Sequence, residues 1–182
     1  MAIISLPRLL LIAGTGRNSG KTTFACKIIE KFSKVHPIVA IKISSHFHPN
    51  VESGPIIING ADLYIAEETD VSKTKDSSLM LAAGAKRSFF VMASDNQVGR
   101  VIQTIVSLIE RTDYIICESG GLRNYIIPGL FFMMNNINNA KPKAISEAYK
   151  ELCDKSITFN GNSIDFNIHS VEISNNSWHL KE

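Results

Sequence analysis

A glycine-containing loop near the N-terminus carries the residue types that bind phosphate. An apolar run at 9–13 leads into it, and Gly20 and Lys21 are followed by Thr22. Backbone N–H groups of such a loop can surround a phosphate at the N-terminus of a helix, where the macrodipole favours an anion. Lys21 can reach β and γ oxygens, and Thr22 can place its hydroxyl on Mg²⁺. The predicted nucleotide-binding residues are Gly16, Arg17, Asn18, Ser19, Gly20, Lys21, Thr22 and Thr23.

One position departs from the usual spacing of a phosphate-binding loop. Such loops carry a glycine five residues before the Gly-Lys pair, but this chain has Thr15 there, between Gly14 and Gly16. The alternative interpretation is a glycine-rich turn between a strand and a helix. The run Gly-Lys-Thr-Thr after an apolar strand and before a helical pattern favours phosphate binding.

A second segment has an acidic residue where a strand ends. The apolar run 114–117 stops at Glu118, and Gly121 follows three residues later. A carboxylate there can hold Mg²⁺ or polarise an attacking water, and the Gly121 N–H can donate to a γ-phosphate. The alternative is a buried strand that ends at an exposed turn. We predict Lys21 and Glu118 as catalytic residues, and Thr22 and Glu118 as metal-binding residues.

The elements that must position these residues alternate along the chain. Apolar runs predict strands near 8–13, 37–43, 87–92, 113–117, 130–134 and 156–159. Helical spacing of apolar residues predicts helices near 20–33, 76–84, 97–109 and 143–153, with Asp95 as a cap before the third of them. Alternation of this kind predicts an α/β fold of three layers with a mostly parallel central sheet.

Residues 44–75 interrupt that alternation. Pro55–Ile58 and Asp62–Glu67 flank Asn59 and Gly60, and Asn-Gly is a favoured two-residue hairpin turn. We therefore predict a β-hairpin excursion after the second strand. It would lie above the strand ends, where sheets of this kind bind their ligands.

Length and composition limit the remaining possibilities. The 182 residues fit a single domain, 1–182, with an irregular or β tail at 160–182 in which Ile164, Phe166 and Ile168 alternate like a strand. A net charge of +2 gives no electrostatic case for nucleic acid or a membrane. No apolar run is long enough to cross a bilayer. Three dispersed cysteines indicate a reducing compartment, so we expect a cytoplasmic protein.

Further polar residues lie at and after the end of the second predicted strand, and before or at the start of the second predicted helix. Lys42 ends a strand, where it can contact phosphate or an acidic partner or remain solvated. His46 and His48 share one face of an extended chain but lack a completing set of metal ligands, so a loop pair near the phosphates or at a dimer contact is favoured over a metal site. Asp76 can cap its helix, which is the favoured role.

Base specificity has a weaker signal. Arg17 can lean over the phosphates or point to solvent. A guanine-reading motif would need an Asp after the strand at 130–134, and the chain instead has amide side chains at Asn135, Asn136, Asn138 and Asn139. Amides can bond either purine, so these residues do not separate GTP from ATP.

In several segments the sequence resembles the molybdopterin-guanine dinucleotide biosynthesis protein B (MobB) family of the P-loop NTPase superfamily. The resemblance covers most of the first 135 residues. It rests on four segments in the family's order: Ser19–Thr23, Ile41–His48, Asp70–Ser78 leading into Ala82–Ala85, and Glu118–Arg123 with Ile127 and Pro128 beyond. The chain departs from the family between His48 and Tyr64, at the Ser-Gly-Gly after Glu118, and after residue 140.

The resemblance implies a P-loop NTPase fold and a guanine-nucleotide-binding protein that hydrolyses GTP slowly in the presence of Mg²⁺. In related nucleotide-binding proteins an acid after the second strand approaches Mg²⁺, and that likeness makes Asp70 or Asp76 a candidate for the same role. It implies a homodimer that assists the guanylyltransferase joining GMP to molybdopterin. Two other functions suit the same fold. One is an ATP-dependent small-molecule kinase or ligase whose acceptor site is formed by residues 44–75. The other is a non-hydrolysing adaptor in which bound nucleotide sets the dimer geometry.

Overall fold

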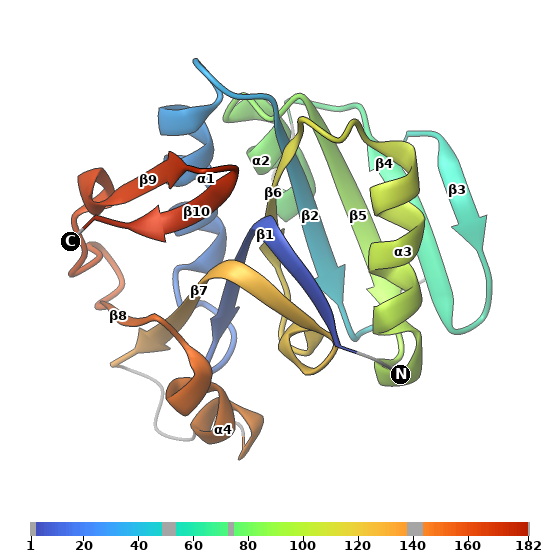
Figure 1. The fold of residues 1–182 in the computed structure, drawn as a ribbon. Helices are drawn as coiled ribbons and strands as arrows, with labels where there is room; N and C mark the ends of the chain where they lie inside the picture. The colour runs from blue at the N-terminus through green and yellow to red at the C-terminus, as the bar shows by residue number, and fades with distance from the viewer. Residues whose placement is uncertain (1–2, 49–53, 73–74, 138–143, 182) are drawn as a thin grey trace.

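The computed structural model describes residues 3–48, 54–72, 75–137 and 144–181. Its centre is an eight-stranded sheet in the order β3-β4-β5-β2-β6-β1-β7-β8 (Figure 1). The pairs from β5 to β8 are parallel, and only β3 and β4 join antiparallel. The strands are β1 (Ile4–Gly14), β2 (Ile38–Ser44), β3 (Ile56–Asn59), β4 (Leu63–Glu68), β5 (Arg87–Ala93), β6 (Tyr114–Glu118), β7 (Ile126–Asn136) and β8 (Lys155–Phe159).

Two buried clusters, one on each face of this sheet, make the predicted three layers. On one face Leu10 and Ile12 of β1 pack with Phe24 and Ile28 of α1. On the other face Leu9 of β1 belongs to the cluster that includes α3 and Tyr149 of α4. Alternate residues of a strand point to opposite faces, so the unbroken apolar run of β1 serves both clusters. The helices are α1 (Lys21–Phe32), α2 (Asp76–Ala82), α3 (Val98–Leu108) and α4 (Ala144–Leu152), with short 3₁₀ turns η1 (Asp95–Gln97), η2 (Leu122–Asn124) and η3 (Ile168–Ser170).

The hairpin predicted after β2 forms, but it does not lie above the strand ends. Its second strand, β4, pairs antiparallel with β5, with Leu63 opposite Ala93 and Ile65 opposite Val91. The hairpin therefore widens the sheet at one edge (Figure 1). The physical reason is that β4 is apolar on both faces, and only inside the sheet are both faces covered. Leu63 and Ile65 join one buried cluster, and Tyr64 and Ala66 join another.

The turn of this hairpin also differs from the prediction. Asn59 belongs to β3, and the loop is the three residues 60–62, closed by the Gly60 N–H donating to Leu63 O at 2.9 Å. Neither Asn59 nor Gly60 is among the described residues with positive φ, which a type I′ turn needs at both central positions. The expected Asn-Gly turn is therefore wrong, although the hairpin is present. Residues 49–53 of the expected excursion lie outside the described residues.

A second hairpin in the C-terminal tail does use such a turn. β9 (Val171–Ser174) and β10 (Ser177–Leu180) pair around Asn175 and Asn176, whose φ values are 49° and 60°. Trp178 is fully buried, and its indole N–H donates to Arg8 O at 2.9 Å. The β character expected for the tail is confirmed, but not the strand expected at 164–168. Ile164 forms only an isolated bridge, to Phe159, although Ile164, Phe166 and Ile168 pack against the buried cluster on the α1 face of the sheet.

Element ends differ from the predictions mainly where strands pair beyond their apolar cores. β1 begins at Ile4, opposite Ile126, and β7 runs through Asn136, so Asn135 and Asn136 end a strand instead of following it. Asp95 is the first residue of η1 and does not cap α3 through its side chain. Here a 3₁₀ turn precedes the helix, which displaces the expected cap. Asn138 and Asn139 lie outside the described residues.

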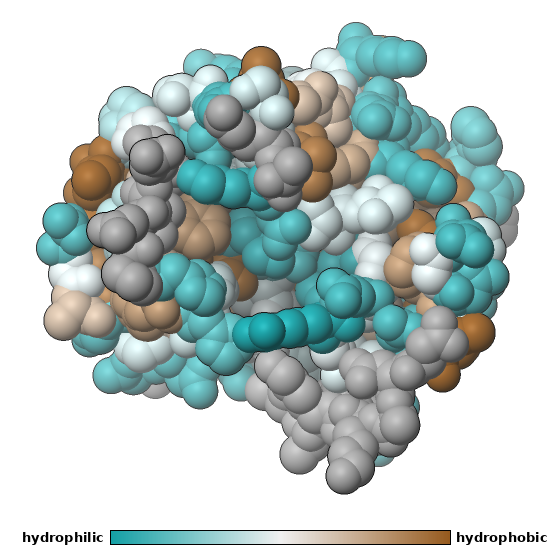
Figure 2. Space-filling view, turned by 180° about the vertical axis from the view of Figure 1, so that it is seen from behind, coloured by the Kyte–Doolittle hydropathy of each residue, from teal (hydrophilic) through white to brown (hydrophobic). Residues whose placement is uncertain are grey.

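The face of the molecule seen from behind is largely polar (Figure 2). Figure 2 shows hydrophilic side chains over the middle of the rear face, with hydrophobic ones in separate areas. Among the described residues no helix combines the length and the apolar composition needed to cross a membrane.

The link between β4 and β5 predicts a pH-dependent contribution to stability. Arg87 donates to both Glu67 oxygens, from Nε at 2.7 Å and from Nη2 at 2.6 Å. These hydrogen bonds from Arg87 lower the pKa of Glu67 below its ordinary value of 4.5. Because the pKa is lower in the folded state, the stabilisation is fully present above pH 4.5 and is lost as the pH falls through the folded-state value.

We expect Glu67→Gln to reduce the free energy of unfolding at pH 7 by about 1 kcal/mol, the upper range for a partly exposed ion pair. The difference from the native chain should shrink below pH 4.5. Urea unfolding at a series of pH values measures it, with exposed Glu151→Gln as the control. A difference that stays constant down to the acid limit contradicts the assignment.

Candidate functional site

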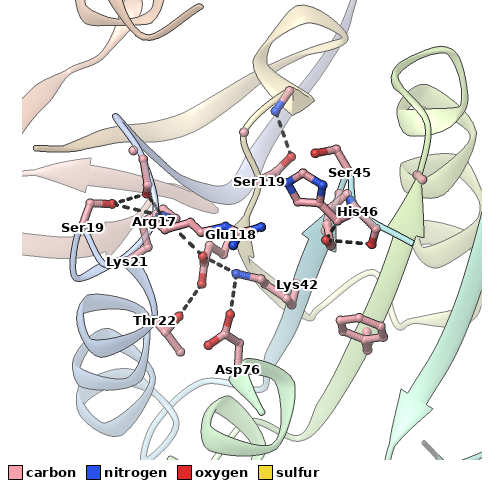
Figure 3. Close-up of a pocket in the computed structure, with 18 of the residues that line it drawn as sticks. Arg17, Ser19, Lys21, Thr22, Lys42, Ser45, His46, Asp76, Glu118 and Ser119 are labelled. Carbon is pink, nitrogen blue, oxygen red and sulfur yellow. Dashed lines mark hydrogen bonds and ion pairs between the residues drawn. The ribbon is translucent and has the colours of Figure 1, made fainter. Parts of the chain in front are cut away.

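The candidate site lies at the carboxyl ends of three neighbouring strands. β6 lies between β1 and β2, and the register places Ile12 and Lys42 on either side of Glu118. A cleft of about 1080 Å³ opens at this edge and is lined by the glycine-containing loop, by Lys42 and by Glu118 (Figure 3). Open α/β sheets bind their ligands at this edge. The structure therefore brings together the two segments that the sequence singled out.

The loop between β1 and α1 is curled, as a phosphate cradle requires. Asn18 and Gly20 both have positive φ, at 54° and 78°, and these two residues turn the chain back on itself. The Asn136 side chain donates to Asn18 O at 2.8 Å, which ties the loop to the end of β7. Asn136 therefore supports the loop, a role that the sequence did not reveal.

Thr15 fits the loop without the glycine usually found at its position. It is buried, its N–H donates to Met134 O at 3.0 Å, and its φ is not positive. The crowded position is Gly14, where a Cβ would lie 2.5 Å from Ser19 Oγ and 3.1 Å from Met134 O. The glycine requirement of this loop therefore falls one residue earlier than the usual spacing predicts.

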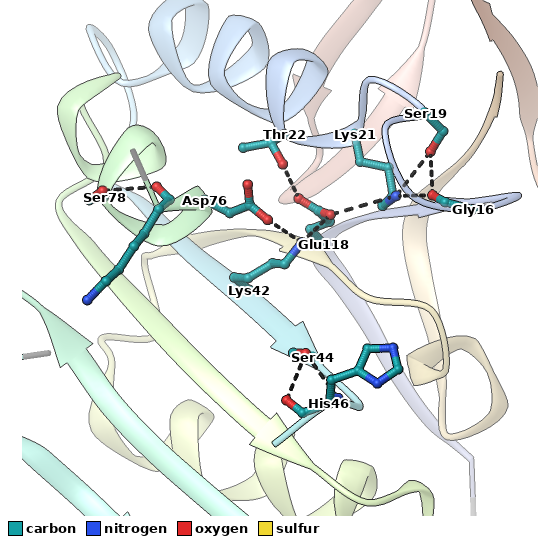
Figure 4. A network of polar contacts seen from close by, with 11 residues as sticks. Gly16, Ser19, Lys21, Thr22, Lys42, Ser44, His46, Asp76, Ser78 and Glu118 are labelled. Carbon is teal, nitrogen blue, oxygen red and sulfur yellow. Dashed lines mark hydrogen bonds and ion pairs between the residues drawn. The ribbon is translucent and has the colours of Figure 1, made fainter. Parts of the chain in front are cut away.

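Lys21 is held at the mouth of the loop. Its Nζ donates to Gly16 O at 2.8 Å and to Ser19 Oγ at 3.0 Å, and it lies 4.0 Å from Glu118 Oε1. Ser19 Oγ in turn donates to Gly16 O at 3.1 Å. These contacts keep the ammonium beside the cleft (Figure 4), where it can meet an anion above the loop.

The first turn of α1 faces the same cleft. Gly20 is the N-cap, and the N–H groups of Lys21, Thr22 and Thr23 precede the first intrahelical bond, which Phe24 makes to Gly20 O at 2.9 Å. N–H groups at this position of a helix have no intrahelical acceptor, so they are available to an anion. A side chain at position 20 would meet the ring of Phe159 at 2.7 Å. Nothing in the sequence around Phe159 indicated this contact.

Glu118 is the centre of the polar network in the cleft. It is 2% exposed, and Thr22 Oγ1 donates to its Oε2 at 2.8 Å. Lys42 Nζ lies 2.5 Å from Glu118 Oε1 and 2.6 Å from Asp76 Oδ2 (Figure 4). The acidic partner that the sequence allowed for Lys42 is thus inside the same chain.

The expected capping role of Asp76 is wrong. Lys75 occupies the N-cap position of α2, no side chain caps the helix, and Asp76 is the first helical residue. Its carboxylate turns to Lys42 instead, an ammonium that also meets Glu118 and so gains a second anionic partner. Asp70, the alternative candidate near a metal, accepts bonds from the Ser72 N–H and hydroxyl in a local turn.

The protonation of these groups follows from burial and charge. Burial acts to lower the pKa of Lys42, but the carboxylates of Glu118 and Asp76 outweigh it, and the pKa is raised. Lys42 is therefore an ammonium at neutral pH. Burial raises the pKa of Cys117, and it raises that of Cys26 to about 11, so both remain thiols. The three cysteines are unpaired with one another.

The oxygen atoms in the cleft suit a hard divalent cation. Thr22 contributes a hydroxyl, and Glu118 and Asp76 contribute carboxylates, which are the ligand types that Mg²⁺ takes. Within the described residues there is no group of three or more His, Cys, Asp or Glu that could hold a metal by itself. One or two carboxylates are sufficient when substrate phosphates complete the coordination of Mg²⁺.

A buried carboxylate in β4 anchors the helix that carries Asp76. Glu68 is 4% exposed, and it accepts bonds from Thr69 N and Asp70 N, each at 3.1 Å, and from Ser77 Oγ at 2.9 Å. Ser88 Oγ of β5 donates to Ser77 O at 2.7 Å. These contacts fix the start of α2 and therefore the position of Asp76.

We expect Glu68→Ala to lower the free energy of unfolding by about 2 kcal/mol, because it leaves a buried hydroxyl and two N–H groups without an acceptor. Glu68→Gln retains a carbonyl oxygen and should lose less. Urea denaturation measures both variants. Equal stability of the alanine variant and the native chain contradicts the anchoring role.

Ser119 shapes the chain after Glu118. Its Oγ accepts bonds from Gly121 N at 3.3 Å and Leu122 N at 3.2 Å, which bend the backbone into η2. Gly121 lines the cleft, and a Cβ built on it would have no neighbour within 4 Å. The sequence did not single out Ser119, although a serine directly after a strand and before Gly-Gly is a common turn former.

The remaining candidates lie around the rim. Arg17 and His46 are exposed and line the cleft, and His48 lines it with its N–H donating to Met92 Sδ at 3.3 Å. Ser44 Oγ donates to His46 O at 3.2 Å and accepts from His46 N at 3.1 Å, so the loop after β2 is locally closed. Both histidines therefore sit beside the cleft without forming a metal site in the described part of the chain.

The site thus combines a curled loop, a lysine at its mouth, and a carboxylate network across β1, β6 and β2. No model of a known protein family, no curated protein and no solved structure matches the chain.

Proposed function

We propose that this protein binds a purine nucleoside triphosphate together with Mg²⁺ and hydrolyses it slowly. One observation carries the proposal: Lys21 and Thr22, at the start of α1, both reach Glu118 at the end of β6. Lys21 Nζ lies 4.0 Å from Glu118 Oε1, and Thr22 Oγ1 donates to Glu118 Oε2. These are the positions that bind phosphate and Mg²⁺ in nucleotide-hydrolysing sites.

In this proposal each side chain has a separate task. The N–H groups of the loop and Lys21 hold the phosphates and offset the charge that develops during transfer. Thr22 and Glu118 would hold Mg²⁺, which would supply further charge neutralisation. Glu118 also orients the attacking water. Slow turnover is consistent with the engagement of both Glu118 oxygens, one with Thr22 and one with Lys42.

A thermal-shift screen with GTP, ATP and CTP, each with and without Mg²⁺, tests nucleotide binding. Ligand at a hundredfold excess over its dissociation constant stabilises the folded state by roughly 2.7 kcal/mol. We expect the largest shift with GTP and Mg²⁺, a smaller one with ATP, and the smallest with CTP. Absence of any shift at millimolar nucleotide rules the proposal out.

The resemblance to the MobB family extends the proposal to a biological role. We propose a cytoplasmic homodimer that assists a molybdopterin guanylyltransferase. The four resembling segments support this role, and the three unpaired cysteines suit a reducing compartment. Analytical ultracentrifugation of the chain alone and mixed with that enzyme is the test. A monomer that never co-sediments with the enzyme contradicts the role while leaving nucleotide binding intact.

A second candidate is phosphoryl transfer or ligation on a small acceptor. It is favoured by the extent of the cleft, which continues from the loop past Lys42 to His46, Asp95 and Tyr125. That space lies over β2 and β5, away from the loop, where an acceptor could face the terminal phosphate. A turnover rate that stays at its basal level across a panel of acceptor metabolites argues against this function.

A further inference from the structure

Two ammonium groups share one carboxylate oxygen in the cleft. Glu118 Oε1 lies 2.5 Å from Lys42 Nζ and 4.0 Å from Lys21 Nζ. Lys21 is held by the loop, through Gly16 O. Lys42 Nζ instead contacts two carboxylates, Glu118 and Asp76, and both come from other elements. The two lysines therefore have different surroundings, which points to different tasks.

The oxygens that Lys42 contacts are those best suited to a divalent cation. Glu118 and Asp76 are the carboxylates that meet Lys42 in the cleft, and Thr22 Oγ1 joins them through Glu118 Oε2 (Figure 4). Mg²⁺ binds carboxylate oxygens at about 2.0–2.1 Å. An ammonium at 2.5 Å from the same oxygen leaves no room for a second cation on that side. On that side of Glu118 Oε1, contact with Lys42 and contact with a metal therefore compete.

The ion pair is also open to exchange. The Lys42 side chain is 17% exposed and that of Asp76 39%, and both line the cleft. Of the three side chains, only that of Glu118 is closed to solvent, with 2% of its surface exposed. A structural ion pair of the core would be closed to solvent on all sides, whereas this one can be reached from the cleft. Its lysine can therefore leave when a stronger cation arrives.

We propose that Lys42 competes with the divalent cation for Glu118 and Asp76, and so makes metal binding dependent on nucleotide. This inference rests on the proposed function, in which the divalent cation is the Mg²⁺ that accompanies the nucleotide. Without nucleotide, the metal must displace the Lys42 ammonium from the two carboxylates that stabilise it. With nucleotide present, the phosphates above the loop offer Lys42 a new anionic partner. Metal and nucleotide then each raise the affinity for the other by the same factor.

Mn²⁺ without nucleotide is the direct probe, because it uses the same oxygen ligands as Mg²⁺ and its binding is read by electron paramagnetic resonance. We expect the native chain to bind Mn²⁺ weakly and Lys42→Met to bind it at least roughly tenfold more tightly, the equivalent of one lost ionic competitor. Lys42→Arg keeps the positive charge and should remain weak. Adding Asp76→Asn to Lys42→Met should return the affinity towards the native value.

A matched control exists in the same chain. Lys86 bridges Glu110 and Asp113 at 3.0 and 3.1 Å, outside the cleft and without the Thr22 hydroxyl. Lys86→Met should leave Mn²⁺ affinity unchanged. Thermal unfolding of every variant checks that it is folded, and Lys42→Gln replaces Lys42→Met if the latter is not.

The coupling is read from the same measurement with a non-hydrolysable GTP analogue. In the native chain the analogue should raise Mn²⁺ affinity strongly, and in Lys42→Met it should raise it less. Unchanged Mn²⁺ affinity in Lys42→Met, or an equal gain in Lys86→Met, overturns the competition. If the native chain still binds nucleotide, the proposed function survives that result. If it binds none, the proposed function fails, whatever Mn²⁺ alone does.

Discussion

Lys21→Ala is expected to weaken nucleotide binding by roughly 100-fold, because hydrogen bonds from an ammonium to phosphate oxygens contribute about 3 kcal/mol in a partly desolvated site. The side chain is well placed for such a loss. Its Nζ is held by Gly16 O at 2.8 Å and Ser19 Oγ at 3.0 Å, so it is already positioned when the ligand arrives. Isothermal titration with GTP and Mg²⁺ measures the effect.

Lys27→Ala provides the matched control for that variant. Lys27 lies on the same helix, two turns from the loop, and it is exposed. The Lys27→Ala variant loses the same charge from α1, but the change lies outside the cleft. Its dissociation constant for GTP should therefore equal that of the native chain. If the two variants weaken binding equally, the effect is one of net charge, and the loop assignment is wrong.

Glu118→Gln is expected to lower the turnover of bound nucleotide by roughly 100-fold or more, the usual contribution of a positioned general base or acid. The amide keeps the shape of the side chain but loses the charge that Mg²⁺ and the attacking water need. Binding of nucleotide should fall much less, since the loop and Lys21 are unchanged. Phosphate release at saturating GTP measures turnover, and the titration above measures binding.

The control for this variant is Glu110→Gln, which neutralises a carboxylate whose side chain is 70% exposed. Its turnover should match that of the native chain. Because Glu118 is buried against Lys42, thermal unfolding must also establish that Glu118→Gln is folded. Native turnover in a folded Glu118→Gln would remove Glu118 from the chemistry and leave it as a partner of Lys42 only.

Together the two variants separate holding the nucleotide from acting on it. Lys21→Ala should fail in binding, and Glu118→Gln should bind but not turn over. An adaptor that uses nucleotide only to set its assembly would show a different pattern, with Lys21→Ala changing the oligomeric state and Glu118→Gln leaving partner binding intact. Sedimentation of both variants distinguishes these outcomes.

Features that depend on neighbouring residues were predictable from the sequence. The apolar run of β1, the small residues after it and the helical spacing of Phe24, Ile28 and Phe32 all lie within one short segment. That segment gave the loop and the start of α1 correctly. Glu118 was equally predictable as a strand end, because the apolar run before it is stable only when it is buried in the interior.

Features that depend on pairing between distant segments were not predictable. The hairpin 56–68 was recognised, but its place at the sheet edge follows from pairing with β5, which its own residues do not encode. The tail hairpin is similar. Asn175 and Asn176 form its turn, yet Trp178 is buried only because Arg8, Phe32 and Tyr114 come together beside it.

The same distinction divides the candidate site. By itself the sequence determined which residues form the loop before α1 and which acid ends a strand, since both depend on residue type and local spacing. Only the tertiary structure decided that Lys42 and Asp76 join Glu118, because these residues come from β2, α2 and β6 and meet through the order of strands in the sheet. The free energy that holds these elements together comes from the buried core beneath the site. The residues of that core are distributed over most of the chain, so no single segment predicts the arrangement.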